Sequence, residues 1–354
     1  MQLVFTTVVR HAPVAAGGWA RVADWPSGRV VAERSVAPVD PPVNDPNPRG
    51  NSRGGRGVVV AGDQIVISNY HTLEVCNRDL SVAGTFSHGN FAGLHEVMRR
   101  GERLFVASTA INAAAEVPLR AVLGAAGAGG KPAAAAAARF WWPTEEPAVC
   151  GRLGVPPTSY PDKQADNRLR HLDLHNRGHA GHLHLNAVDA DGDQAYALLN
   201  KPGAILRLDA LGAMEVVLRH PLLEGAHNLE FVGPGRAWVV GTRSGLLVEC
   251  DLVAGTVRPL IDLAATPFAR GVARSGSEPR AWSWRRWLRR ERALTAPSDR
   301  SLFWRGLAID DDWIFVGTSP ASILGFDRRT FAYRGVVRFS ANEREIVHGI
   351  AILA

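Results

Sequence analysis

Residues 305–319 read RGLAIDDDWIFVGTS, and the same pattern occurs near the start of the chain, where residues 56–69 read RGVVVAGDQIVISN. Each stretch has a polar first residue, a short apolar run, a Gly or Asp turn six residues after the first residue, and a second apolar run that ends in small polar residues. Short alternating apolar runs joined by such turns are typical of antiparallel β-strands. The two stretches therefore predict a repeated β-hairpin.

The hairpin pattern recurs along the chain. Its polar first residue, which we call the anchor, is in turn Arg56, His95, Asn186, His227, Arg305 and His348. Three of the intervals between neighbouring anchors are roughly 40 residues and the other two are about twice that, which is the spacing of a repeat with two insertions. Several copies continue into a third and a fourth strand, for example ILRLDALG and MEVVLRH. Units of four short strands predict the blades of a β-propeller.

Six anchors predict an all-β, six-bladed propeller that occupies residues 1–354 as a single domain. The sixth anchor has only one strand after it, HGIAIL, so we expect the N-terminal segments QLVFTTVV, GWARVADW and GRVVAERSV to complete that blade. Such closure leaves no exposed sheet edge. The alternative is a two-domain β-sandwich protein in which the regular spacing has no structural meaning.

Two segments exceed the repeat length and are predicted to be insertions that cover the mouth of the propeller. Residues 112–170 begin as an Ala/Gly-rich helical or flexible stretch and then become aromatic and Pro-rich in FWWPTEEP. Residues 264–300 contain RAWSWRRWLRRERAL, in which Trp and Leu residues can share one helix face surrounded by arginines. Such a helix can bind a membrane surface or RNA, but more often it packs over its own domain. We expect both segments to be lids.

The composition restricts the class of protein. No apolar run reaches the roughly 18 residues of a spanning helix, and the first ten residues lack the features of a signal peptide. Cys76, Cys150 and Cys250 have no paired spacing, which argues against disulfides and favours a soluble protein of the cytoplasm. The net charge of +6 comes from arginines scattered along an Ala/Gly/Pro-rich chain, so it gives no strong case for a nucleic-acid partner.

The anchors predict a polar site on the propeller axis. The first strand of every blade lines the central channel, so residues in the same phase of these strands face one another. The six anchors are three histidines, two arginines and an asparagine, and none is apolar. His184 lies two residues before Asn186 and is expected on the same strand face, which adds a fourth histidine.

Histidine nitrogens fixed on separate strands are suited to bind a divalent metal such as iron, zinc or manganese. We expect the metal ligands to be His95, His184, His227 and His348. Glu96 and Glu230 are candidate general bases or partners that orient the ligands. Arg56 and Arg305, together with Asn186, are expected to bind a small anionic substrate. Lyase, hydrolase and oxygenase chemistry are all compatible with this set.

Other interpretations remain open. The same side chains can bind an anion or a sugar without a metal, or they can be structural packing between strands. A non-catalytic propeller that binds a peptide or a partner protein is the alternative to an enzyme. The chain has no P-loop, dinucleotide-binding fingerprint, nucleophile elbow or H-E-x-x-H motif. Asp162 and Asp166, like residues 310–312, indicate solvated turns rather than a glycosidase carboxylate pair.

Residues 170–186 read RHLDLHNRGHAGHLHLN and hold five of the twelve histidines of the chain. His171, His175 and His179 have helical spacing, but we expect them in the first insertion rather than in a local zinc site. His182 shares the phase of His184 and is expected at the channel entrance. Only His184 and Asn186 are in register with the anchors of other blades.

The segments HLHLNAV, LHEVMRRGERLFVAST, RGLAIDDDWIFVGTS and HGIAIL together resemble a group of uncharacterised bacterial propeller proteins with anchors of the types H-L-N-G, R-G-L-A and F-V-G-x-S. The resemblance implies a six-bladed propeller and no particular reaction. The chain departs from it at Ala187, where glycine is expected, and in its Ala-rich insertion. The axial histidines are also similar to those of carotenoid-cleaving oxygenases and of the streptogramin-inactivating lyase, propellers with an axial metal, which is an analogy of fold alone.

Overall fold

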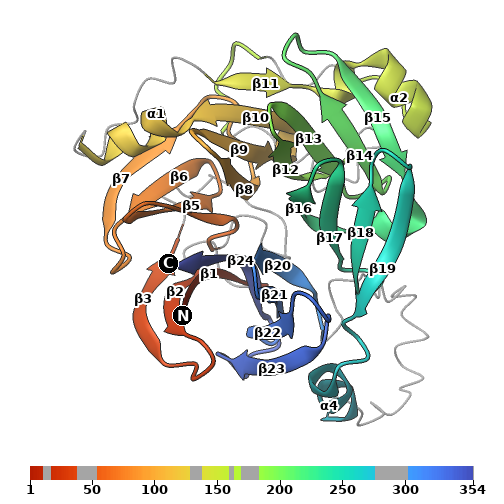
Figure 1. Cartoon of the computed structure of the whole chain (residues 1–354). Coiled ribbons are helices and arrows are strands. Elements are labelled where there is room, and N and C mark those ends of the chain that lie inside the picture. The colour runs from red at the N-terminus through yellow and green to blue at the C-terminus, as the bar shows by residue number, and fades with distance from the viewer. Residues whose placement is uncertain are drawn as a thin grey trace, which may run out of the picture.

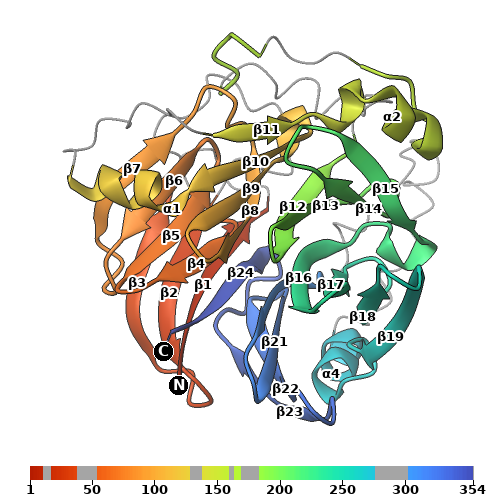
Figure 2. The ribbon, with the colours of Figure 1, turned by 45° about the horizontal axis from the view of Figure 1, so that its top comes forward.

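The protein is a six-bladed β-propeller. The computed structural model describes residues 1–10, 17–37, 54–127, 138–158, 163–168, 183–275 and 302–353. Six antiparallel sheets, each of four strands, follow one another around a central axis, and Figures 1 and 2 show the ring from two directions. The predicted fold class is therefore confirmed, and the two-domain sandwich is excluded.

The blades are numbered here by the order of their inner strands. Blade 1 consists of β4 (Val58–Ala61), β5 (Gln64–Asn69), β6 (Thr72–Cys76) and β7 (Val82–Ser87). Blade 2 consists of β8 (Leu94–Arg100), β9 (Arg103–Ser108), β10 (Ala113–Pro118) and β11 (Arg139–Trp141). Blade 3 consists of β12 (Leu185–Asp191), β13 (Gln194–Leu199), β14 (Ala204–Leu208) and β15 (Met214–Arg219).

The second half of the ring is built in the same way. Blade 4 consists of β16 (His227–Gly233), β17 (Arg236–Gly241), β18 (Leu246–Asp251) and β19 (Thr256–Asp262). Blade 5 consists of β20 (Arg305–Ile309), β21 (Trp313–Thr318), β22 (Ser322–Asp327) and β23 (Tyr333–Arg338). Blade 6 consists of β24 (Glu345–Leu353), β1 (Gln2–Val9), β2 (Gly18–Asp24) and β3 (Val30–Val36).

Blade 6 joins the two ends of the chain. Strand β24 pairs antiparallel with β1, with Leu353 opposite Gln2 and Glu345 opposite Val9. Both termini accordingly lie in this blade (Figure 1). The predicted closure by N-terminal strands is confirmed, and it makes the last strand of the chain the inner strand of a complete blade.

The first predicted insertion contains blade structure. Within residues 112–170, β10 and β11 complete the sheet of blade 2. The alanines of β10 are fully buried, and the strand pairs with β9 on one side and β11 on the other. The expectation of a helix or a flexible stretch from residue 112 is therefore wrong for β10, where strand pairing overrides helix propensity.

The few helices of the described residues lie in the connections between strands. Helices α1 (Leu119–Leu123) and α2 (Pro147–Leu153) lie at the outer rim, and α2 packs on β15 (Figures 1 and 2). Helix α4 (Pro267–Ser275) begins the second predicted insertion. Short 3-10 turns cover Thr109–Ile111, Gly124–Gly127, Pro143–Glu145 and Pro221–Leu223. None of the helices in the described residues is both long and apolar enough to cross a membrane.

Several predicted features fall outside the described residues. They include the Trp/Arg-rich part of residues 264–300 and the histidines at positions 171, 175, 179 and 182. The expectation that these segments form lids therefore stays a prediction.

Apolar side chains fill the spaces between neighbouring blades. Phe105 of blade 2 packs in one buried cluster with Leu206 of blade 3, and Phe5 of blade 6 packs in another with Phe315 of blade 5. Because each blade is held on both sides, the inner strands form a rigid frame around the axis.

Hydrogen bonds from small polar residues also connect neighbouring blades. In five places a side chain of a second strand, or of the residue just after it, donates to a backbone carbonyl at or just before the start of the next inner strand, over 2.5–2.9 Å, and only Thr6 lies in the middle of its strand. The donors and carbonyls are Thr6 to Arg56, Ser68 to His95, Thr109 to Leu185, Asn200 to Ala226, and Thr242 to Trp304. We call these bonds the inter-blade latches. They explain why the second apolar run of the repeat ends in small polar residues.

Candidate metal and anion site

The anchors lie at irregularities of the inner strands. The pairing between the first and second strands shifts register at His95 and Glu96 in β8, at Asn228 in β16, and at Gly306 in β20. Strand β24 shifts at His348 in its pairing with β1. A β-bulge bends the strand and changes the direction of the side chain. The anchor side chains are therefore turned toward the axis by bulges as well as by strand alternation.

The residue after each anchor lies where neighbouring strands approach closely. A side chain on Gly57 would place its Cβ 2.3 Å from the nitrogen of Val97, and one on Gly349 would place it 2.4 Å from the carbonyl oxygen of Arg56. Four of the six blades accordingly have Gly or Ala at this position. Glu96 and Asn228 are the two exceptions, so both bring a polar group to the axis.

Three histidines gather around His95. The centroid of its ring lies 4.4 Å from that of His348, 5.2 Å from that of His227 and 6.1 Å from that of His184. His95, His227 and His348 are almost completely buried, with exposed fractions of 1, 3 and 0%. Residues from four blades are thus brought into one cluster.

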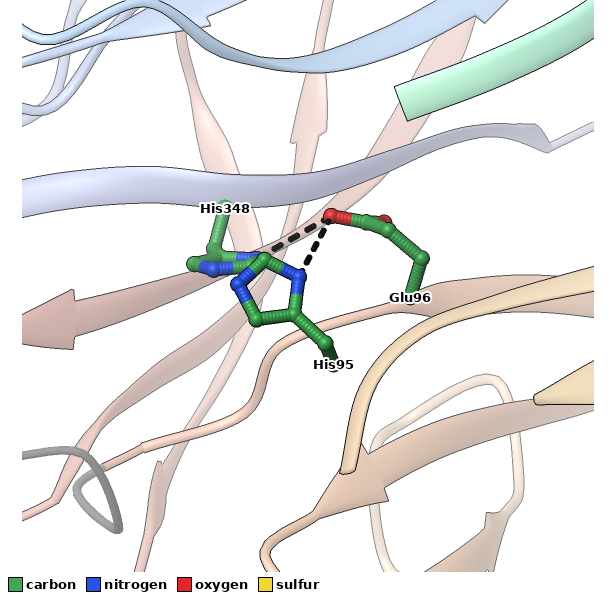
Figure 3. A group of neighbouring side chains, drawn as sticks. All are labelled: His95, Glu96 and His348. Atoms are coloured by element: carbon green, nitrogen blue, oxygen red, sulfur yellow. Dashed lines mark ion pairs between the residues drawn. The ribbon is translucent and has the colours of Figure 1, made fainter. Parts of the chain in front are cut away.

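Glu96 connects two of these histidines. Its Oε1 lies 3.5 Å from Nδ1 of His95 and 3.4 Å from Nδ1 of His348, and Figure 3 shows both side chains turned toward the carboxylate. The possible ligand atoms of the three residues all lie within 4.8 Å of one another, so this group could hold a metal ion. Glu96, expected as a base or an orienting group, thus lies among the candidate ligands, whereas His184 and His227 lie outside this group.

His227 has a defined tautomer. Its Nδ1 lies 2.7 Å from Oγ1 of Thr242 and 3.2 Å from the carbonyl oxygen of Gly225. The Thr242 hydroxyl donates its own proton to the carbonyl of Trp304, so it can only accept from the histidine. The proton of His227 therefore resides on Nδ1, which leaves the lone pair of Nε2 without a hydrogen-bond partner.

Burial favours the neutral form of His95, His227 and His348. Desolvation, reinforced by nearby histidines and arginines, lowers the pKa of His95 and His348 well below the usual range, and the backbone of Arg56 opposes this only in part at His348. Desolvation followed by Arg305 likewise lowers the pKa of His227. Desolvation raises the pKa of Glu96 to about 8, although Arg305 and Arg56 act in the opposite direction. At neutral pH the imidazoles are neutral, the form in which histidine binds a metal.

Two arginines lie beside the cluster. Arg56 precedes β4 and Arg305 begins β20, and both affect the charges of the histidines. The guanidinium of Arg305 stacks 4.3 Å from the centre of the Phe303 ring, and its Nε is buried without a hydrogen-bond partner. Burial and the charge of Arg56 lower the pKa of Arg305, but a guanidinium keeps its proton in proteins. This buried positive charge favours an anionic ligand.

Two other residues that were predicted to belong to the site, Asn186 and His184, differ in position from what the sequence suggested. Asn186 is buried in β12 and donates from Nδ2 to the carbonyl of Ala226, 3.0 Å away, so it connects blades 3 and 4. His184 lies just before β12 with a φ of 56°, and its backbone N–H donates to Oδ1 of Asn112. The expected common strand face of His184 and Asn186 is therefore wrong, although the His184 ring still lies near His95.

Glu230 is not part of the histidine cluster. It lies three residues after His227 on β16, where its charge interacts with Asp189, Arg100 and Arg328. Thr242, by contrast, was not selected from the sequence, although it fixes the orientation of His227. The sequence feature that could have identified Thr242 is the small polar residue at which the second apolar run of the repeat ends.

Comparisons with known proteins support the fold and no more. No family model matches the chain, and no curated protein is similar to it in sequence. A protein of unknown function from Bacteroides caccae matches with a TM-score of 0.58 and 8% identity, over 99% of this chain and 97% of its own. A chain of a nidogen/laminin complex matches with a TM-score of 0.54 and 8% identity over the same shares.

A virginiamycin B lyase from Staphylococcus aureus is also similar in fold, with a TM-score of 0.42 and 8% identity over 82% of this chain and 72% of the lyase. The likeness to these structures concerns the propeller alone. The resemblance to the uncharacterised bacterial family stays a prediction.

Proposed function

We propose that the protein is an enzyme that binds one divalent metal ion at His95, Glu96 and His348 and acts on a small anionic substrate. The observation that carries the proposal is a set of buried polar atoms at the axis without hydrogen-bond partners. They are both ring nitrogens of His95 and His348, Nε2 of His227 and Oε1 of Glu96. An unpaired buried polar group costs about 1–3 kcal/mol, so a ligand that satisfies several of them gains affinity.

The donor set is suited to a metal of intermediate hardness. Two imidazoles and one carboxylate with no sulfur suit zinc, iron or manganese. Burial favours the neutral imidazoles that such an ion requires. When bound, the metal would act as a Lewis acid that stabilises negative charge on the substrate.

The positive charge of the metal-loaded site would be balanced by an anionic substrate. A divalent ion beside Arg56 and Arg305 adds positive charge, and Glu96 alone cannot balance it. A substrate carboxylate or phosphate between the metal site and Arg305 would restore the balance, and a guanidinium binds such groups through two parallel hydrogen bonds. Stacking on the Phe303 ring favours one orientation of the Arg305 guanidinium.

His227 is the best-placed base. Its Nδ1–H is held by Thr242 and Gly225, so the lone pair of Nε2 is the unpaired one, on a ring whose centroid lies 5.2 Å from that of His95. We assign it the removal of a proton from the carbon next to the substrate's acidic group. In a lyase reaction the proton moves to Nε2 and the C–H electron pair forms a double bond as a leaving group departs from the neighbouring carbon.

A metal-free anion-binding site is the second candidate. The arginines favour it, because positive charge near the imidazoles opposes a dication. A non-catalytic propeller scaffold that binds a peptide or a partner protein on one face is the remaining alternative. The Trp/Arg-rich segment that would test it lies outside the described residues.

Metal analysis of protein purified without an affinity tag tests the proposal. We expect about one equivalent of zinc, iron or manganese per chain, reduced at least about fivefold in His95→Ala, Glu96→Gln and His348→Ala. His220→Ala is the matched control, because this histidine caps a rim turn and should leave the metal content unchanged. Sub-stoichiometric metal that is the same in all of these proteins would refute the metal site.

Anion binding separates the two candidates. We expect malonate, measured by calorimetry, to bind the metal-loaded protein and to lose about tenfold in affinity in Arg305→Gln, whose metal content stays unchanged. Arg344→Gln, at an exposed arginine, is the control. If malonate binds equally well after the metal is removed by a chelator, the metal-free candidate is correct.

A further inference from the structure

The channel contains a cavity beyond Glu96, toward the carboxyl ends of the inner strands. Its volume is about 380 Å³, and it is lined by strands β4, β8, β16, β20 and β24. Most of its wall is aliphatic, including Val59, Ala308 and Ile350. This volume falls within the range of small-molecule sites. None of the four axial histidines lines it, and Glu96 is the one candidate metal ligand in its wall, so the cavity adjoins the proposed metal site.

Glu230 faces this cavity without a counter-charge of its own. Arg100 is the arginine whose charge affects Glu230 most. It donates two hydrogen bonds of 2.7 and 2.8 Å to Asp189 and a third to the carbonyl of Phe231. Among the described residues, Glu230 forms no ion pair or hydrogen bond through its side chain. Burial, followed by the charge of Asp189, raises the pKa of Glu230 to about 8. A positively charged ligand would stabilise its ionised form.

Asn228 supplies a second acceptor. It lies two residues before Glu230 on β16, and both residues line the cavity. Asn228 is 6% exposed, and its Oδ1 has no hydrogen-bond partner. It also occupies the position after the anchor where most blades have Gly or Ala. A buried amide oxygen without a donor is costly unless a ligand supplies one.

The remaining charged residues of the lining are already bound. Arg99 donates to the carbonyls of Val60 and Gly101, and Arg100 is neutralised by Asp189. Glu96 points its Oε1 toward the histidines. Oδ1 of Asn228 and the carboxylate of Glu230 are therefore the acceptors of the lining for which the described part of the chain shows no donor.

We propose that this cavity binds a small primary amine. Its ammonium group donates hydrogen bonds to the carboxylate of Glu230 and to Oδ1 of Asn228, and its alkyl part packs on the aliphatic wall. A neutral alcohol would leave the carboxylate without a counter-charge. Glu230 belongs to no group of ligand atoms close enough to share one metal ion, so a metal fits less well.

Calorimetry with n-butylamine tests this site, with n-butanol as the uncharged probe of the same shape. We expect n-butylamine to bind and n-butanol not to bind. Affinity should fall at least about tenfold in Glu230→Gln, which keeps the shape of the side chain and removes its charge. Asn228→Ala should weaken binding as well. Ala351→Leu, which fills the cavity from β24, should abolish binding without touching either polar group.

Two comparisons make the outcome decisive. His95→Ala should bind n-butylamine as the unaltered protein does, so failure of the metal site and failure of this site are distinguishable. Glu230→Gln should in turn keep its metal. The proposal is overturned if n-butylamine does not bind, if Glu230→Gln or Ala351→Leu binds it unchanged, or if calcium or magnesium ions bind in the cavity and the amine does not.

Discussion

Replacing Glu230 with glutamine should make the protein more stable at neutral and alkaline pH. In the unfolded chain this carboxyl ionises near its ordinary pKa of 4.5, whereas in the folded protein it keeps its proton up to about pH 8. The folded state thus binds the proton more tightly, so stability falls as the pH rises from 4.5 to about 8 and is constant above that. Glutamine in its place removes this loss.

The magnitude follows from the shift in the pKa of Glu230. Each pKa unit corresponds to about 1.4 kcal/mol, so the full shift would amount to roughly 5 kcal/mol. The carboxyl borders a cavity that water can enter, which weakens the effect, and we expect Glu230→Gln to gain about 2–3 kcal/mol at about pH 9 and almost nothing at about pH 4.5. Glu96, whose pKa is also raised to about 8, contributes equally to both proteins and cancels in the difference.

Urea unfolding followed by tryptophan fluorescence measures this difference at the two pH values. Glu343→Gln, at an exposed glutamate, controls for the general effect of removing one negative charge. If the stability of Glu230→Gln changes with pH in the same way as that of the unaltered protein, the carboxyl is not desolvated as described and the reasoning is wrong.

Three further substitutions test the frame of the site by the same unfolding measurement. Thr242→Val removes a latch and the acceptor of the adjacent histidine, and we expect a loss of about 1–3 kcal/mol. Gly57→Ala places a methyl group 2.3 Å from the nitrogen of Val97 and should cost at least about 3 kcal/mol. Asp189→Asn removes the buried carboxylate that pairs with the partly exposed Arg100, and we expect a loss of about 1–3 kcal/mol.

Matched variants give these losses their meaning. Thr242→Ser keeps the hydroxyl and should retain most of the stability, whereas Gly124→Ala, where a Cβ would meet nothing within 4 Å, should be nearly neutral. Equal losses in the paired variants would show that neither the latch nor the close approach of strands is responsible.

The propeller was predictable because each copy of its repeat can be recognised within a short stretch of sequence. Each copy places an anchor, a turn and a small polar terminus at fixed intervals, and each of these has its own structural role. The gathering of His95, His227 and His348 followed from that register alone. Sequence distance was irrelevant, since the blades bring equivalent positions to one axis.

The details of the site were less accessible for a physical reason. Strand alternation predicts faces only where pairing is regular, and the bulges at the anchors interrupt it. Asn186 therefore bonds to a neighbouring blade, and Glu96 turns toward two histidines although it directly follows one of them. Strand β10 was not predicted because its run of alanines favours a helix by local propensity, and its burial between other strands depends on tertiary contacts.

The pairing of β24 with β1 also has a consequence for the assembly of the candidate site. His348 lies on β24, whose partner in the same sheet is β1. His95 and Glu96 belong to blade 2, so they meet His348 only when β24 has taken its place as the inner strand of blade 6. An open ring therefore holds only part of this group, and closure of the ring and completion of the group are the same event.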